Sequence, residues 1–267
     1  MIRSPHLHAF LLLLVLQALN WPKAWAQSDN PQGLRQVEMY STHDRLSGPF
    51  ANWHELGLRG LYRTGPHLLS GEVAALQRFQ EKGTYLALGD TVVLDRHWYG
   101  SLTMGAGDGA SYLPRYRIDG FVHRKWLDDL SLVTSVGLGH YKAPDSHKDD
   151  ALSLGLSWYL PASWVLQAEA KYNSSRPGPI GTQQYFVATT WGLAGQTRIT
   201  GRYGWGEEGY QSLGADAFIS RFSSRQTSLS VQHWLGPNWG IKAGAERYSN
   251  PFYRREGLQL TVFKEMP

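Results

Sequence analysis

Charged side chains recur along many segments of this chain, and they are the residues that could bind or guide a polar solute. Alternate residues of a β-strand face the same side, so each row of charges marks one face of a strand. Charges inside a closed sheet must pair or meet water, because an unpaired buried charge is costly. The candidate lumen-facing residues are Glu55, Arg59, Arg63, Glu72, Arg78, Arg117, Asp119, Lys125, Glu169, Lys171, Arg198, Arg202, Lys242 and Glu246, with His123 beside them.

Two interpretations of these inward charges remain open. In the first, Glu55, Asp119, Glu169 and Glu246 neutralise the arginines in a network of salt bridges that fills a closed lumen. In the second, the charges line a wet polar channel for a hydrophilic solute or glycan. Aromatic residues would then act as stacking surfaces along the path, and the candidates are Phe121, Tyr141 and Phe186.

Motifs for catalysis or metal binding are weak. Asp149-Asp150 beside His147-Lys148 is the nearest candidate for a catalytic acid pair, but a charge run of this kind is typical of a solvated loop. The histidines after the leader have no metal-ligand spacing. Residues 105–109 (Gly-Ala-Gly-Asp-Gly) lack the helix of a phosphate loop and the acidic spacing of a calcium loop, which indicates a flexible loop. We therefore expect no enzyme activity, metal or cofactor.

The elements that position the charges are strands with one apolar face. Residues 164–173 show this alternation most cleanly, with an aromatic residue at each end of the apolar face, as in strands that cross an outer membrane. On this pattern Leu166 and Ala168 lie near the bilayer midplane and Gln167 faces the lumen. The apolar face is Trp164, Leu166, Ala168, Ala170 and Tyr172, and the opposite face is Val165, Gln167, Glu169, Lys171 and Asn173.

Several other segments repeat this pattern. Residues 54–63, 116–126 and 197–205 alternate in the same way, and Arg124 can reach the interface from the outer face. The segment 84–94 is ambiguous, because Asp90 shares a face with three apolar residues. The final strand, 258–263, is apolar at alternate positions and ends near Phe263, which supports a barrel.

Connections between the segments alternate in length. Short turns lie near residues 65, 95, 128, 161, 194 and 237, and most of the intervening connections are longer and polar, at 43–52, 107–114, 142–149, 174–182, 206–224 and 249–254. This is typical of an all-β, antiparallel, up-and-down transmembrane barrel with periplasmic short turns and termini. The count is about 14 strands, or about 12 if residues 34–42 or 84–94 fail to form strands. A soluble β-sandwich would also alternate, but aromatic residues at both ends of the apolar faces favour the membrane barrel.

The first residues carry the pattern of a signal peptide. An apolar run over residues 9–19 is too short to span a membrane as a helix and is followed by small residues at Ala24 and Ala26, so we expect cleavage before Gln27. The predicted organisation is a signal peptide at 1–26, a short periplasmic lead-in with the first strand at 27–44, and an outer-membrane barrel at 45–267. We therefore expect export to the Gram-negative outer membrane.

Composition supports the barrel and excludes some classes of partner. The formal net charge of +4 falls to +2 without the leader, which does not indicate nucleic acid as a partner. The absence of cysteine excludes disulfides and thiolate metal sites. The 29 Gly, 14 Tyr and 11 Trp beside a negative mean hydropathy suit a barrel, in which aromatic residues lie at both interfaces.

Residues 112–119 (Tyr-Leu-Pro-Arg-Tyr-Arg-Ile-Asp) resemble the entry into a central strand of the YaiO family of outer-membrane β-barrels. Further similarity lies at 71–79, at Gly192, at 201–203 and at 246–257, and the resemblance covers roughly residues 45–263. It implies an outer-membrane barrel and does not imply a reaction. Some members of the family lie beside polysaccharide-export machinery, so the resemblance also points towards envelope glycans.

These observations predict an integral outer-membrane barrel with a passive role, as a channel or as an accessory in envelope or exopolysaccharide traffic. The alternative is a non-conducting scaffold or surface-binding barrel, and a lipid-modifying or proteolytic enzyme comes third. The expected partners are outer-membrane lipid and lipopolysaccharide, the barrel assembly machinery and a polysaccharide-export system.

Overall fold

Alternation of apolar and polar residues continues through the described chain, and each alternating segment forms a strand. The structure is a computed structural model that describes residues 33–178, 180–214 and 217–266. Its strands are β1 (Gly33–Leu46), β2 (Trp53–Thr64), β3 (His67–Arg78), β4 (Glu81–Val93), β5 (Trp98–Gly107), β6 (Tyr116–Trp126), β7 (Leu132–Lys142), β8 (Lys148–Leu160), β9 (Trp164–Arg176), β10 (Ile180–Gly192), β11 (Thr197–Gly214), β12 (Ala217–Gly236), β13 (Trp239–Ser249) and β14 (Arg254–Glu265).

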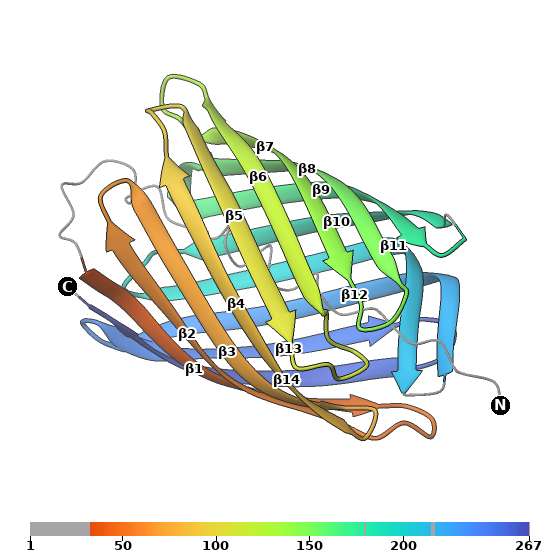
Figure 1. Cartoon of the computed structure of the whole chain (residues 1–267). Helices are drawn as coiled ribbons and strands as arrows, with labels where there is room; N and C mark the ends of the chain where they lie inside the picture. Colours follow the sequence, from red (N-terminus) through yellow and green to blue (C-terminus); the bar gives the residue numbers. More distant parts are fainter. Residues whose placement is uncertain (1–32, 179, 215–216, 267) are drawn as a thin grey trace.

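The 14 strands close into one antiparallel barrel. Each strand pairs with the next along the chain, and β1 pairs with β14, from Gln36 opposite Glu265 to Leu46 opposite Arg255. Figure 1 shows the tilted strands and the C-terminus beside the start of β1. The prediction of 14 strands is confirmed, and the uncertain segments 34–42 and 84–94 form β1 and β4.

The two rims of the barrel differ in their connections. Six tight connections lie at the rim that also holds the start of β1 and the end of β14, which makes this rim periplasmic. In one of them Asp95 accepts hydrogen bonds from the backbone N–H groups of His97 and Trp98, which lowers the pKa of its carboxyl group. The other rim is extracellular by the same reasoning.

Three sequence expectations concern segments that the structure assigns differently or does not describe. The expected loop 206–224 is mostly strand, because β11 and β12 continue to pair past the rim as far as Gly214 and Ala217. The polar residues of this segment suit a pair of strands that extends beyond the membrane and is surrounded by water. The expected loop 105–109 is strand up to Gly107. The predicted signal peptide and its cleavage site lie outside the described residues.

The outer surface is an apolar belt between two bands of aromatic residues. On β9, Trp164 and Tyr172 are exposed at the two ends and Leu166 lies between them, whereas Gln167 and Glu169 are buried. The predicted faces of this strand are confirmed. Aromatic bands of this kind lie at the headgroup level. The outward aromatics near the periplasmic rim are Trp98, Trp126, Trp158, Trp164, Trp191 and Trp239, and those nearer the extracellular rim include Tyr116, Tyr172, Tyr185 and Trp205.

Polar groups on the outer face lie at its edges. Arg124 extends over the ring of Trp126, with its Cζ 3.7 Å from the ring centroid, as expected for a cation at the interface. Asp90, which made the segment 84–94 ambiguous, lies 2.7 Å from Nδ1 of His67 near the periplasmic rim. Among the described residues, no helix is long and apolar enough to span a membrane.

Inward aromatic rings lie across glycines of neighbouring strands. Tyr40 covers Gly57 and Tyr85 covers Gly105, so closely that a Cβ atom on either glycine would come within 2.4 Å of the ring atoms or the hydroxyl. A larger residue at these glycines would displace the ring. The high glycine content therefore allows aromatic side chains to lie flat against the inner wall.

Candidate functional site

The lumen holds a wide cavity that begins at the periplasmic rim. It has a volume of about 940 Å³ and is lined at its mouth by residues of the short turns, such as Pro66, Arg96 and Asp129. Deeper inside it is lined by Arg59, Lys242 and other polar residues from most strands of the barrel. We call this cavity the periplasmic vestibule. Its volume is that of a typical small-molecule site.

A smaller cavity continues towards the extracellular side. It has a volume of about 190 Å³. Since several residues line both cavities, the two meet at one level of the barrel, and the path narrows there. The shared residues are Arg59, Glu72, Tyr85, Thr200, Ser230 and Lys242.

A network of charged side chains lies on one side of this narrow level, on β1, β2 and β3. The Tyr40 hydroxyl lies 2.9 Å from a carboxylate oxygen of Glu55 and 2.5 Å from one of Glu72, so its single proton can be donated to either. Arg59 lies 3.0 Å from Glu72, and Arg78 lies 2.9 Å from Glu55. The guanidinium of Arg59 also covers the Tyr40 ring at 4.3 Å. These contacts pair the charges with one another and fix the side chains on this part of the inner wall.

A second network lies towards the extracellular end of the lumen, near β13 and β14. Arg255, which is 2 % exposed, forms an ion pair with Glu246 and lies 3.9 Å from Asp44. Its guanidinium lies between the rings of Trp53 and Tyr248, about 5 Å from each. Together with Leu46 and Tyr253, these rings form a buried cluster. The extracellular half of the lumen is thus partly filled.

The loop between β5 and β6 folds into the barrel. Tyr112, Leu113 and Pro114 are all buried, and the Tyr112 hydroxyl donates a hydrogen bond to the carbonyl of Leu76 on β3 (2.9 Å). Burial raises the pKa of the Tyr112 hydroxyl above its usual value. Because these three residues also line the smaller cavity, residues 108–115 form an inward loop that narrows the path.

Three inward cations on β11 and β13 have a different environment. Among the residues that the structure describes, no carboxylate lies within 4.0 Å of Arg198, Arg202 or Lys242. Arg198 donates to the Gln232 side chain at 3.3 Å, and the guanidinium of Arg202 covers the Phe186 ring at 4.4 Å. We call Arg198, Arg202 and Lys242 the cationic wall.

Aromatic rings line another part of the vestibule. Tyr99 on β5 stacks on His123 on β6, with ring centroids 4.3 Å apart and planes 8° apart. Phe121 and Tyr159 line the same cavity. We call these four residues the aromatic wall. Of the stacking surfaces expected from the sequence, Phe121 is in place. The other two expected surfaces, Tyr141 and Phe186, are buried and line neither cavity.

The structure brings most of the predicted lumen residues together. All of them except Lys171 line one or both cavities, and Lys171 follows Glu169 on the inward face of β9. Sequence reasoning missed Tyr40 and Arg255, which organise the two charge networks. Their inward direction follows from alternation along the strand, because Met39 next to Tyr40 and Leu258 three residues after Arg255 are apolar and point outward.

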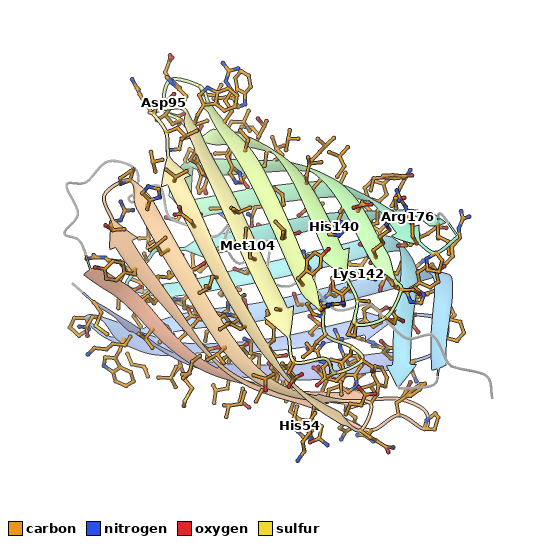
Figure 2. The ribbon with its side chains drawn as sticks, viewed as in Figure 1. His54, Asp95, Met104, His140, Lys142 and Arg176 are labelled. Atoms are coloured by element: carbon orange, nitrogen blue, oxygen red, sulfur yellow. The ribbon has the colours of Figure 1, made fainter. Side chains whose placement is uncertain are left out.

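The candidate acid pair is divided between the two faces of β8. Asp150 lies 2.7 Å from His140 and 3.8 Å from Arg176, and Figure 2 shows His140 and Arg176 on the outer side of the barrel. Asp149 lies opposite the buried Tyr141 instead. The neighbouring His147 pairs with Asp145 at 2.8 Å. The two acids therefore do not act on one substrate together, and the described residues contain no group of three or more metal-ligand side chains.

Comparison with protein families decides the classification. The model of the YaiO membrane beta barrel domain matches residues 34–211, about two thirds of the chain. The chain belongs to the YaiO family. It is an outer-membrane β-barrel, and the family resemblance noted in the sequence is confirmed. The comparison with curated proteins finds no match.

Solved structures with the same fold are outer-membrane barrels. A bacterial polysaccharide outer membrane secretin aligns with a TM-score of 0.57 at 10 % identity, over 89 % of this chain and 100 % of its own. An outer membrane channel from Pseudomonas putida F1 aligns with a TM-score of 0.56 at 10 % identity, over 89 % and 97 %. Omp33 of Acinetobacter baumannii aligns with a TM-score of 0.53 at 10 % identity, over 87 % and 99 %. At such identities the similarity establishes the fold alone.

Proposed function

We propose that this YaiO-family barrel is a passive conduit for a hydrophilic solute across the outer membrane. The observation that carries the proposal is the polar vestibule of about 940 Å³, which continues into a narrower cavity on the extracellular side. Cations without a close carboxylate partner would be costly in a dry lumen and are tolerated in a wet one. The lumen thus combines a partly filled extracellular half with a narrow polar path.

The solute proposed is a saccharide of the envelope, which would make the protein a component of envelope or exopolysaccharide traffic. Two facts support this choice. The rings of Tyr99, Phe121 and Tyr159 line the vestibule and provide apolar contact surface for a sugar ring, and a polysaccharide secretin is among the barrels of similar fold. The likeness to that protein concerns the fold, so the choice of solute depends on the lumen residues.

Planar-bilayer recording of the purified, refolded protein tests the conduit. We expect small, discrete current steps in potassium chloride. The control is the same preparation after heat unfolding. It contains the same detergent without the folded barrel, so any current steps in it come from the detergent or a contaminant. Absence of steps over many insertions would contradict the proposal.

A specific observation favours a second candidate, a non-conducting scaffold or surface-binding barrel. The cluster around Trp53, which is 1 % exposed, and the inward loop at Tyr112 together occupy much of the extracellular half. If these elements do not move, the vestibule is a blind pocket. A barrel that folds and binds a ligand without conducting would support this candidate.

The proposed partners follow from the outer surface. Lys148 on β8 lies opposite Lys142 on β7 and Arg176 on β9, and Figure 2 shows Lys142 and Arg176 near the extracellular rim, where the phosphate groups of lipopolysaccharide would lie. Insertion would require the barrel assembly machinery, and solute delivery would require a periplasmic polysaccharide-export system. Co-purification from crosslinked membranes tests both protein partners.

A further inference from the structure

We infer that the periplasmic vestibule is a binding site for an anionic saccharide, whose ring packs on the aromatic wall while its acidic groups pair with Arg198 and Lys242 of the cationic wall. The inference deepens the proposed function, since it names the class of solute that the path would select.

The cationic wall is arranged as a row of donors. Arg198 lies opposite Gln232 on β12, and Gln232 lies opposite Lys242 on β13, so three polar side chains stand side by side. Neighbouring strands are about 4.8 Å apart, which places the backbone positions of Arg198 and Lys242 about 10 Å from each other. That spacing allows one ligand to contact both. A guanidinium and an ammonium are suited to carboxylate or phosphate groups.

The carboxylates that line the same cavity have other partners. Glu38, Glu169 and Glu265 attract Lys242, Arg202 and Arg198 only from beyond 4.0 Å, so a soluble anion can approach these cations more closely than the carboxylates of the cavity do. Glu72 and Glu38 lie near Arg59, Asp119 pairs with Arg117, and Glu265 accepts a hydrogen bond from the Trp234 indole.

The aromatic wall faces the cationic wall across the lumen. β6 and β13 are separated by six strands in either direction around the barrel, so Phe121 and His123 lie on the opposite side from Lys242. A pyranose ring has an apolar C–H face, which leaves water when it packs on a flat aromatic surface. A ligand between the walls would therefore need an apolar ring face and a negative charge, and an acidic sugar has both.

Isothermal titration calorimetry on the whole detergent-folded barrel tests the inference, because access from the periplasmic mouth does not require conduction. The probes are a hyaluronan tetrasaccharide, which bears carboxylates, the neutral chitotetraose, and citrate as an anion without a sugar ring. We expect the acidic tetrasaccharide to bind at least tenfold more tightly than either of the others. Equal binding of chitotetraose would overturn the role of charge, and equal binding of citrate would overturn the role of the ring.

Variants connect the binding to the two walls. Lys242→Gln should weaken binding of the acidic tetrasaccharide by roughly tenfold, as for one lost charge-assisted hydrogen bond. Arg198→Gln combined with Lys242→Gln should weaken it further. Tyr99→Leu should weaken it as well. The matched control is Arg247→Gln, which removes an exposed cation near the extracellular rim and should change nothing.

Folding and conduction are measured separately. Each variant is first compared with the wild type by heat-modifiable gel mobility, and the single Lys242→Gln variant serves if the double variant does not fold. Folded wall variants that bind like the wild type would overturn the inference. Saccharide binding without current steps would contradict the conduit but support the saccharide site. Current steps without saccharide binding would support the conduit but contradict the saccharide site.

Discussion

At the scale of single residues, Arg255 and Arg202 should behave in opposite ways. Removing Arg255 leaves the buried Asp44 and the partly buried Glu246 without their shared cation, so Arg255→Met should lower the unfolding free energy by about 3–5 kcal/mol. Urea unfolding in lipid vesicles measures this. Arg202→Met keeps the packing on Phe186 and leaves no close carboxylate unpaired, so its loss of stability should be much smaller. Equal losses would contradict this division of the lumen.

Arg202 also provides a test of selectivity. If the lumen conducts, loss of this cation should shift the reversal potential of Arg202→Ala in a salt gradient towards cation selectivity, because the wall charge attracts anions into the path. The same measurement on Arg247→Gln is the control, since that cation is exposed near the extracellular rim. An unchanged reversal potential in a conducting Arg202 variant would mean that ions do not pass this side chain.

Neighbouring residues on β9 test which face meets lipid. Ala168 lies outward, midway between Trp164 and Tyr172, and the adjacent Gln167 lines the smaller cavity. Ala168→Arg should cost roughly 2–4 kcal/mol, as for a cation near the midplane of the bilayer, and Gln167→Arg should cost much less. Refolding yields and urea midpoints in vesicles compare the two variants. A larger cost at Gln167 would reverse the assignment of the faces.

The direction in which most side chains point could be predicted from the alternation of apolar and polar residues alone. The period of two placed Arg59, Asp119 and Arg202 inward without any knowledge of contacts. It could not show that Arg255 pairs with Glu246 while Arg202 lacks a close acid, because pairing depends on which strands become neighbours and how far each is staggered. The difference between the paired charges around Arg255 and the cations without a close acid, such as Arg202, therefore arises from strand pairing and stagger.

At the scale of elements, the inward loop 108–115 should control the width of the path. Tyr112 anchors the loop to the carbonyl of Leu76, so Tyr112→Ala should free the loop and raise the single-channel conductance. Tyr112→Phe keeps most of the packing and loses one hydrogen bond, so its increase should be smaller. Planar-bilayer recording compares the three proteins. A conductance that is the same in all three would show that the narrow point lies elsewhere, around Tyr40.

The elements differ in how well their sequences predicted them. Strands in the membrane were recognisable, since lipid requires an apolar face of fixed length. The prediction of a loop over residues 206–224 was wrong for most of that segment. The residues form the ends of β11 and β12, which pair in water, where no apolar face is needed. The inward course of residues 108–115 had no sequence signal of its own: Tyr112 and Leu113 are buried only because distant strands supply their surroundings.

At the scale of the whole molecule, closure of β1 on β14 satisfies the backbone along the last strand edge, so the barrel can cross a bilayer without an exposed ladder. The folded protein should therefore fractionate with the outer membrane and migrate faster on an unheated gel than on a heated one. Its mature N-terminus, by sequencing, should be Gln27, as the small residues at Ala24 and Ala26 predict. A neighbouring soluble periplasmic protein is the control for lysis. Recovery of the barrel in that soluble fraction would contradict its place in the membrane, and a different N-terminus would contradict the cleavage site alone.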